Sequence, residues 1–129
     1  MDPILYDIMP IDITKYTALD AFTHAVETYD AKKSSPYTRK LSEVTIRDIL
    51  TYLPKAITEF STQGKPSLDT RERLSYAAML MGINLSNSST CLPHRIQYGL
   101  STVSDASHAK GLASVFRAWL KLSSPKVPN

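Results

Sequence analysis

The chain has 129 residues, of which 43% are hydrophobic and 21% are charged, and its net charge is +3. This length and composition are typical of one soluble globular domain with its own core, and they exclude wholesale disorder, collagen and disulfide scaffolds. The 4 glycines are too dispersed for a glycine-rich phosphate loop, and the basic residues form no concentrated stripe. Neither a standard nucleotide-phosphate loop nor nucleic-acid binding is therefore expected.

Helical periodicity dominates the chain, and the alternation typical of strands is nearly absent. A first helix is predicted from about residues 14–17 to residue 29. A second helix begins with Ser34 or Ser35 as its cap and Pro36 in its first turn, which is a common start arrangement. Pro54 is expected to interrupt this helix, because proline lacks an amide donor and crowds the preceding turn.

The second half of the chain shows the same periodicity. A third helix is predicted to begin at Asp69, with Glu72 as its capping-box partner. Almost all of its residues from 76 to 85 are apolar or small, so we expect this helix to lie at the centre of the domain. The remaining predictions are a fourth helix from about 91–93 to 100, a fifth from about Ser107, and a loose tail from about 123. The chain is thus predicted to be all-α, a compact domain of about five helices over residues 1–129.

Apolar residues in the last predicted helix suggest self-association. Phe116 and Trp119 have few later residues to cover them, and contiguous exposed apolar patches are uncommon in monomers. We expect a homodimer or a higher symmetric oligomer with the C-terminal helix at or near the interface. The alternative is that these residues close a compact monomer of five helices.

The cellular compartment is indicated by the cysteine content and the N-terminal segment. Cys91 has no second thiol in the chain, which fits a reducing compartment. The first ten residues include Asp2 and Asp7 and no basic residue, so they do not resemble a signal peptide. The longest uncharged run, 74–93, is too polar to span a bilayer. We expect a cytoplasmic protein without a membrane partner.

Four side chains are candidates for one metal site. Asp20 and His24 are four residues apart in the first helix, which places both on one face, although such a pair alone is more typical of a surface hydrogen bond. His94 and His108 each fall near the predicted N-terminus of a helix, where the helix dipole favours the neutral imidazole that binds metal. Together they would suit a divalent ion such as Fe, Zn, Ni or Co. Spacing alone does not show that these elements meet.

Residues 20–27, Asp-Ala-Phe-Thr-His-Ala-Val-Glu, resemble the D-A-x-x-H-A-x-E motif of the iron-containing (group III) alcohol dehydrogenases. In that family the Asp and His of the motif are metal ligands, and two histidines 14 residues apart complete the set, which is the interval between His94 and His108. The resemblance runs from Asp2 to about Lys121, and the segment after His108 is most similar to the butanol-dehydrogenase-like branch. It implies the fold of the family's C-terminal helical domain and a divalent metal, Fe or Zn with Ni or Co as further options, held by Asp20, His24, His94 and His108.

The chain also departs from the family pattern. Family members are much longer and place a Rossmann-like nucleotide-binding domain before the helical domain, so the resemblance covers only part of the helical metal-binding domain. NAD(P) is then expected only in complete relatives or on a separate nucleotide-binding chain. Many members have a further histidine four residues after the third ligand, where this chain has Tyr98, a candidate pocket residue whose phenol could bind a substrate oxygen. Ala109 replaces the glycine that commonly follows the last ligand.

The resemblance implies an oxidoreductase domain that takes part in the interconversion of alcohols and aldehydes. The metal would act as a Lewis acid on the substrate oxygen while hydride moves to or from the nicotinamide. Alone, this domain is expected to be inactive, so its status as an enzyme stays open. Two alternatives remain: a truncated remnant or helical interaction module without catalysis, and a structural metal protein, which would need a closed coordination sphere.

Overall fold

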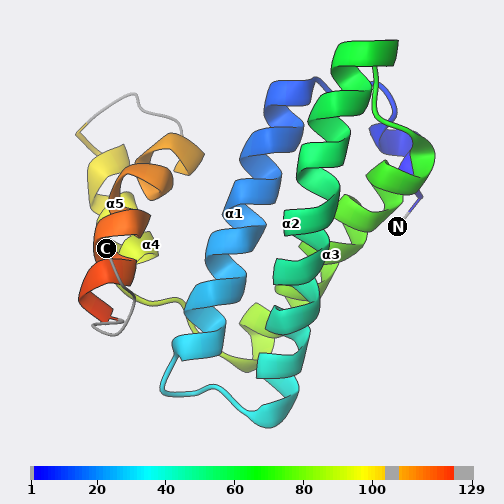
Figure 1. Ribbon diagram of the computed structural model, residues 1–129. Coiled ribbons are helices and arrows are strands. Elements are labelled where there is room, and N and C mark those ends of the chain that lie inside the picture. Colours follow the sequence, from blue (N-terminus) through cyan, green and yellow to red (C-terminus); the bar gives the residue numbers. More distant parts are fainter. Residues whose placement is uncertain (1, 104–107, 124–129) are drawn as a thin grey trace.

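The computed structural model describes residues 2–103 and 108–123, and these residues are helical apart from short connections (Figure 1). The elements in chain order are a short 3-10 helix, η1 (Pro3–Tyr6), and the α-helices α1 (Ile11–Asp30), α2 (Pro36–Gln63), α3 (Leu68–Asn87), α4 (Leu92–Ser101) and α5 (His108–Ser123). The described residues contain five α-helices and no strand, which confirms the all-α prediction. Ser107 and the tail after residue 123 lie outside the described residues.

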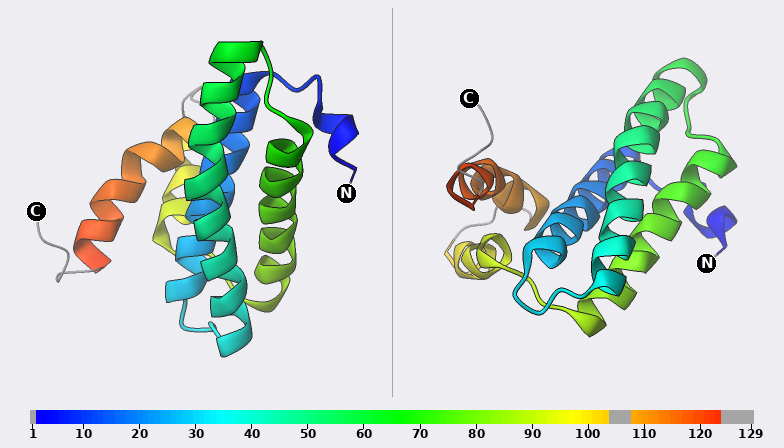
Figure 2. Two further views of the ribbon diagram at one scale, coloured as in Figure 1. Left: turned by 45° about the vertical axis from the view of Figure 1, so that its right-hand side comes forward. Right: turned by 60° about the horizontal axis from the view of Figure 1, so that its bottom comes forward.

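Helices α1, α2 and α3 form a bundle, and the pair α4–α5 packs on the other side of α1 (Figure 2). The buried core of the bundle comprises Ala18, Ala21 and Ala25 of α1, Ile49 of α2, and Ala77, Leu80 and Met81 of α3. Small alanine side chains on α1 let its neighbours approach closely. Since α1 contacts α2, α3 and α5, it is the central helix. The central position predicted for α3 is wrong, because one face of α3 exposes Tyr76 and Ile83.

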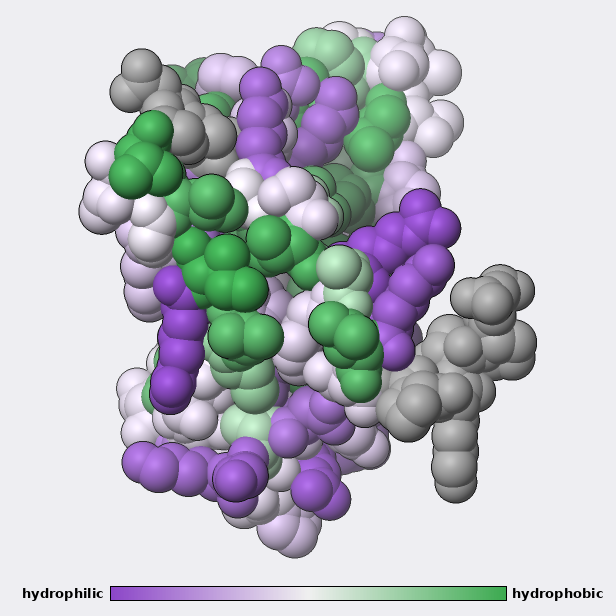
Figure 3. Space-filling view, turned by 90° about the vertical axis from the view of Figure 1, so that its left-hand side faces the viewer, coloured by the Kyte–Doolittle hydropathy of each residue, from purple (hydrophilic) through white to green (hydrophobic). Residues whose placement is uncertain are grey.

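The apolar side chains of α5 are mostly covered by the chain itself. The ring of Phe116 packs edge-on against Phe22 of α1, with 5.9 Å between the ring centroids, and Trp119 is 9% exposed. These two residues therefore pack within the chain itself, as the compact-monomer alternative expects, and the expected oligomer stays a prediction. Other apolar side chains gather on the face of the molecule that α4 and α5 form (Figure 3). Val103, which follows α4, and Leu122 of α5 are largely exposed.

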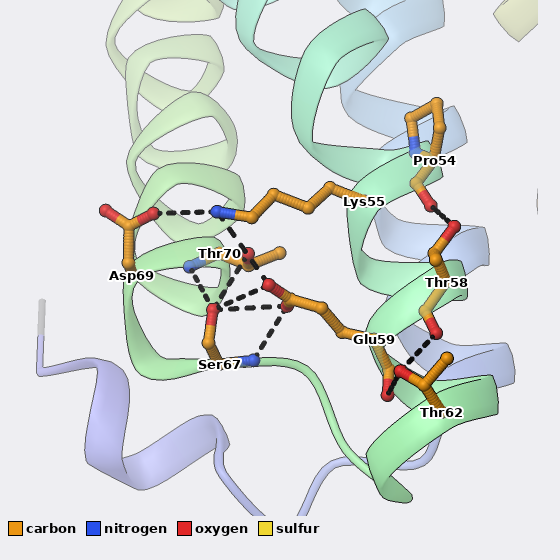
Figure 4. Close-up of polar contacts among 8 residues, drawn as sticks. All are labelled: Pro54, Lys55, Thr58, Glu59, Thr62, Ser67, Asp69 and Thr70. Carbon is orange, nitrogen blue, oxygen red and sulfur yellow. Dashed lines mark hydrogen bonds and ion pairs between the residues drawn. The ribbon is translucent and has the colours of Figure 1, made fainter.

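The corner between α2 and α3 is built by polar contacts (Figure 4). The Ser67 hydroxyl accepts a hydrogen bond from the Thr70 amide at 3.4 Å, so Ser67 is the cap of α3. The Glu59 carboxylate in turn accepts from the Ser67 amide at 2.8 Å. Asp69, the predicted cap, instead forms an ion pair with Lys55 at 3.2 Å. The predicted start of this helix was therefore in error, since a serine two residues earlier supplies the cap.

Helix α2 continues through Pro54, so the predicted interruption is wrong. The helix begins with the expected cap, in which the Ser35 hydroxyl accepts from the Thr38 amide at 3.2 Å. It ends at Gly64, whose φ of 81° is the left-handed conformation that glycine adopts most readily. Pro54 lies on the exposed side of the helix, where water can satisfy the carbonyl group that loses its amide donor.

Replacing Pro54 with alanine is expected to raise the free energy of unfolding by about 2 kcal/mol. Alanine restores an amide donor inside the helix, and the gain is reduced because proline also restricts the unfolded chain. Urea unfolding followed by circular dichroism measures the change. Thr51→Ala, also exposed on α2, is the control and should change stability by only a few tenths of a kcal/mol. A destabilised Pro54→Ala variant would contradict this account.

A buried polar cluster joins the three bundle helices. The Asn84 side-chain amide on α3 donates to Thr28 of α1 at 2.9 Å and to Ser42 of α2 at 2.9 Å, and both hydroxyls are fully buried. Because buried polar groups are costly when unpaired, this cluster fixes one register between the helices. Thr28 lies one turn beyond His24, so the cluster also sets the orientation of the α1 face that carries the candidate ligands.

Among the described residues, no helix has the length and apolar character needed to cross a membrane.

Candidate metal centre

The four candidate ligands come from three helices and converge at one place. Asp20 and His24 lie one turn apart on α1, His94 lies in the first turn of α4, and His108 begins α5. The Oδ1 atom of Asp20 is 3.4 Å from His94 Nε2 and 3.3 Å from His108 Nε2. One possible ligand atom from each of these three residues lies within 4.8 Å of the other two. Asp20 is therefore the centre of the group.

His24 lies beside this group of three atoms. Its Nε2 is 3.6 Å from the second carboxylate oxygen of Asp20, Oδ2. Its ring stacks on the ring of His94, with 3.8 Å between the centroids and 23° between the planes. A metal ion held by Asp20, His94 and His108 would gain His24 as a fourth ligand only if the His24 ring turned out of this stack.

The site contains buried polar atoms that have no hydrogen-bond partner among the described residues. They include Asp20 Oδ1 and His94 Nε2, which face each other, and His24 Nδ1. Unpaired polar atoms are costly in a protein interior, and a cation is the kind of group that satisfies a carboxylate oxygen and an imidazole lone pair together. Imidazole nitrogen with carboxylate oxygen is also a ligand set that suits zinc and iron. The residues present therefore fit a divalent metal ion.

The pKa values of the site groups are shifted by burial and by each other. Burial opposes the charged form of His94, but the carboxylates of Asp20 and Glu27 outweigh it and raise the pKa of His94 to about 9. Burial and the positive charge of His94 lower the pKa of His24. Burial alone would raise the pKa of Asp20, yet its histidine neighbours lower it. Without metal at neutral pH, His94 is therefore protonated, and a metal ion bound to its Nε2 would displace a proton.

The metal-free chain is expected to lose stability as the pH rises from about 6.5 to about 9. The pKa of His94 is higher in the folded chain than its ordinary 6.5, so its contribution is complete below 6.5 and is lost as the pH passes about 9. The loss is at most about 3 kcal/mol, at about 1.4 kcal/mol per pKa unit. His24 acts in the opposite sense, because its lowered pKa reduces stability as the pH falls below 6.5. Urea unfolding across this pH range measures both effects, and a flat profile above pH 6.5 would contradict the first.

Glu27 is a further site residue, and the spacing of the candidate ligands does not predict it. Its side chain is completely buried on α1, and its Oε1 atom is 2.7 Å from His94 Nδ1. Its Oε2 atom accepts a hydrogen bond from the Cys91 amide at the start of α4. The only signal in the sequence was its place in the segment 20–27, seven residues after Asp20 and hence on nearly the same helix face.

Tyr98 lies at the rim of the site. Its ring is 6.3 Å from the ring of His108 and 6.4 Å from that of His94, and it is 57% exposed. The phenol thus borders the group without belonging to it. The side chain of Ala109 lies outside the described part of the chain.

Gln97 and Gly111 bring α4 and α5 together one turn beyond His94 and His108. Gln97 is completely buried, and both polar atoms of its amide lack a hydrogen-bond partner among the described residues. A side chain at Gly111 would collide with the Gln97 amide oxygen, so the glycine makes room for this glutamine. Neither residue can be recognised from the sequence, because a polar residue near a candidate ligand carries no signal of burial.

Residues 14–129 match the family model described as "Fe-containing alcohol dehydrogenase family, C-terminal". The chain belongs to this family. The match covers nearly all of the described residues, so the resemblance inferred from residues 20–27, His94 and His108 is confirmed at the level of the family. The family is described as iron-containing, and the group formed by Asp20, His94 and His108 could hold a metal ion.

Individual relatives agree with the family assignment. The chain is 31% identical to a long-chain primary alcohol dehydrogenase of Thermoanaerobacter ethanolicus, over 98% of this chain and 31% of the relative. It is 32% identical to the NAD-dependent methanol dehydrogenase of Bacillus methanolicus over 84% of this chain and 27% of the relative. It is 33% identical to the 1,3-propanediol dehydrogenase of Klebsiella pneumoniae over 83% of this chain and 26% of the relative.

The fold is similar to part of a solved structure. The crystal structure of an iron-containing alcohol dehydrogenase from Thermotoga maritima matches 92% of this chain with a TM-score of 0.76 and 29% sequence identity, over 32% of the length of that protein. The predicted fold, that of the C-terminal helical domain of this family, is confirmed. The chain spans about a third or less of the length of the relatives it matches.

Proposed function

We propose that this domain holds a divalent metal ion that serves the interconversion of alcohols and aldehydes, with Asp20, His24, His94 and His108 as its ligands. The observation that carries the proposal is the position of Asp20 Oδ1, which is within 3.4 Å of His94 Nε2 and 3.3 Å of His108 Nε2. Iron, zinc, nickel and cobalt all accept imidazole and carboxylate ligands. We propose iron or zinc first, with nickel and cobalt as further options.

The metal would supply Lewis acidity toward the oxygen atom of an alcohol or aldehyde. The residues of this chain define how such a substrate would approach. His94 is buried at the base of the site, whereas the side chains of His108 and Asp20 are partly exposed, so the site opens on the side that they share with Tyr98. The Tyr98 phenol at this rim could donate a hydrogen bond to the substrate oxygen. This open side favours a substrate site over the closed coordination sphere of a structural metal protein.

The hydride carrier would be NAD(P) on a nucleotide-binding domain, either in the same polypeptide or on a separate chain. The four glycines of this chain form no phosphate-binding loop. The competing hypothesis is a helical interaction module or truncated remnant without catalysis. It predicts a chain that folds but binds no metal with useful affinity.

Elemental analysis of the purified chain is the direct test of the metal. We expect about one equivalent of a divalent ion in the wild-type chain and a clear loss in His24→Ala. Equal metal content in the two proteins would contradict the role of His24, and a wild-type chain that stays metal-free after incubation with Fe²⁺ or Zn²⁺ would favour the interaction module.

The isolated chain is expected to show no turnover of butanol or propanol with NAD or NADP. Without a domain that positions the nicotinamide beside the metal, the reaction loses a proximity contribution of roughly 7–11 kcal/mol. Absorbance at the reduced-nicotinamide band measures the rate. Turnover by the pure chain would overturn this prediction, and turnover only after addition of a separate nucleotide-binding domain would support a two-chain enzyme.

Self-association remains a second proposal for the partners of this chain. The supporting observation is the apolar surface formed by α4 and α5 (Figure 3), together with Leu122 of α5, which is 81% exposed, and Val103, which follows α4 and is 80% exposed. We infer that a second copy covers this face in a homodimer, since apolar burial contributes about 25 cal/mol per Å². Light scattering should then give twice the chain mass at high concentration and a smaller mass for Leu122→Ser. One chain mass at every concentration would contradict it.

A further inference from the structure

Among the described residues, the carboxylate of Glu27 has two hydrogen-bond partners, and both come from the start of α4. Its Oε1 lies 2.7 Å from His94 Nδ1, and its Oε2 accepts from the Cys91 amide. The Cys91 thiol donates to the backbone oxygen of Glu27 at 3.3 Å. Glu27 is fully buried and His94 is 1% exposed, so water does not compete for these contacts. An ionised carboxylate only accepts hydrogen bonds, so His94 must present a proton on Nδ1.

We propose that Glu27 is the positioning residue for the metal: by accepting the Nδ1 proton of His94, it leaves the Nε2 lone pair directed at Asp20 and His108. A neutral imidazole has one proton, and the partner of one nitrogen decides which nitrogen remains free. His94 Nε2 is indeed buried, 3.4 Å from Asp20 Oδ1, and no described residue forms a hydrogen bond with it. This inference rests on the proposed metal function, because it assigns Glu27 the task of preparing one of the metal ligands.

Glu27 also holds the backbone that carries His94. Helix α4 approaches no helix other than α5, among the described residues, at the level of the backbone. The contacts of Glu27 with Cys91 and His94 therefore connect the start of α4 directly to α1. They fix both the orientation of the His94 ring and the position of the His94 backbone relative to Asp20. Hydrogen bonds of this kind to a ligand histidine commonly change metal affinity about 10–100-fold.

The chemistry of the two contacts requires a carboxylate rather than an amide. In Glu27→Gln the single amide oxygen can accept from His94 or from Cys91, and the NH₂ group must face the other donor. If the NH₂ group faces His94 Nδ1, the histidine proton moves to Nε2 and blocks the metal position. If it faces the Cys91 amide, two donors meet and the start of α4 shifts. Either arrangement disturbs the ligand without changing the size of the side chain.

The test compares Co²⁺ binding by the full wild-type chain, Glu27→Gln and Glu43→Gln. Glu43 forms an exposed ion pair with Lys40 and serves as the matched control. We expect Co²⁺ affinity about 10–100-fold weaker for Glu27→Gln, with an altered Co²⁺ absorption spectrum, and no change for Glu43→Gln. Circular dichroism confirms that each variant is folded. If Glu27→Gln does not fold, Glu27→Asp replaces it in the test. This variant keeps the carboxylate on a shorter side chain, and we expect its Co²⁺ affinity to be weaker than that of the wild-type chain.

A second measurement reports the histidine proton without any substitution. In ¹⁵N-labelled wild-type chain kept metal-free well above pH 9, where neutral His94 predominates, the nitrogen–hydrogen correlation spectrum should show the proton of His94 on Nδ1. Unchanged Co²⁺ affinity and spectrum in folded Glu27→Gln, or a proton on Nε2 in the wild type, would overturn the positioning role. A wild-type chain that binds no Co²⁺ but has the proton on Nδ1 would contradict the metal function alone.

Discussion

Replacing His94 with alanine is expected to weaken Zn²⁺ binding about a hundredfold or more. His94 supplies one of the three ligand atoms that already lie within 4.8 Å of each other, and its ring is buried beneath the site. Zinc sites with four ligands gain about 10–16 kcal/mol on binding, so one ligand contributes on the order of 3 kcal/mol, which is about two factors of ten. Calorimetric titration of the folded, metal-free proteins measures the change.

The other site residues supply graded controls for this experiment. His24→Ala should cost less than His94→Ala, because His24 must leave its stack on His94 before it can bind the same ion. Tyr98→Phe removes only the phenol oxygen at the rim and should leave Zn²⁺ affinity unchanged. If His94→Ala and His24→Ala both bind Zn²⁺ as tightly as the wild-type chain, the shared site does not exist.

The order of the helices follows directly from the sequence, but their depth in the fold does not. The Ser35 cap and Pro36 in the first turn of α2 are local signals, and each acts through the backbone of its own segment. The central helix could not be identified in this way. Almost all of residues 76–85 are apolar or small, yet one face of α3 stays exposed, whereas alanines 18, 21 and 25 let α2 and α3 approach α1 closely.

In the candidate site, too, the local spacing of residues is predictable from the sequence, whereas the packing of distant helices is not. The four-residue spacing predicts that Asp20 and His24 share a helix face, and in the structure Asp20 Oδ2 is 3.6 Å from His24 Nε2. The meeting of His94 and His108 with Asp20 depends on how α4 and α5 return to α1, which no local pattern specifies. The interval between the two histidines suggested it only through the family resemblance. Glu27 shows a further limit, because a glutamate on a helix is usually exposed and nothing in its neighbours signals complete burial.

Adding Zn²⁺ is expected to slow hydrogen exchange in α4 and α5 far more than in α2 and α3. The pair α4–α5 is joined to the bundle through the packing of α5 on α1 and through the side chains of the site. An ion held by Asp20, His94 and His108 would add a bond from α1 to each of these two helices. If α4 and α5 separate from α1, Asp20 no longer lies beside His94 and His108, and the ion loses ligands. Metal therefore stabilises only the form in which α4 and α5 are packed on α1.

The size of this effect follows from mass action. At a free Zn²⁺ concentration 100 times the dissociation constant, this packed form gains about 2.7 kcal/mol, so amides that exchange through opening of α4–α5 should slow about a hundredfold. Mass spectrometry of peptides from α4 and α5 measures the change, with peptides from α2 as the internal reference. Asp20→Asn weakens the ligand that all three histidines face and should lose most of the protection. Equal slowing in α2 and α4 would mean that the helices open only by global unfolding, and no slowing in α4 and α5 would mean that the ion does not join them to α1.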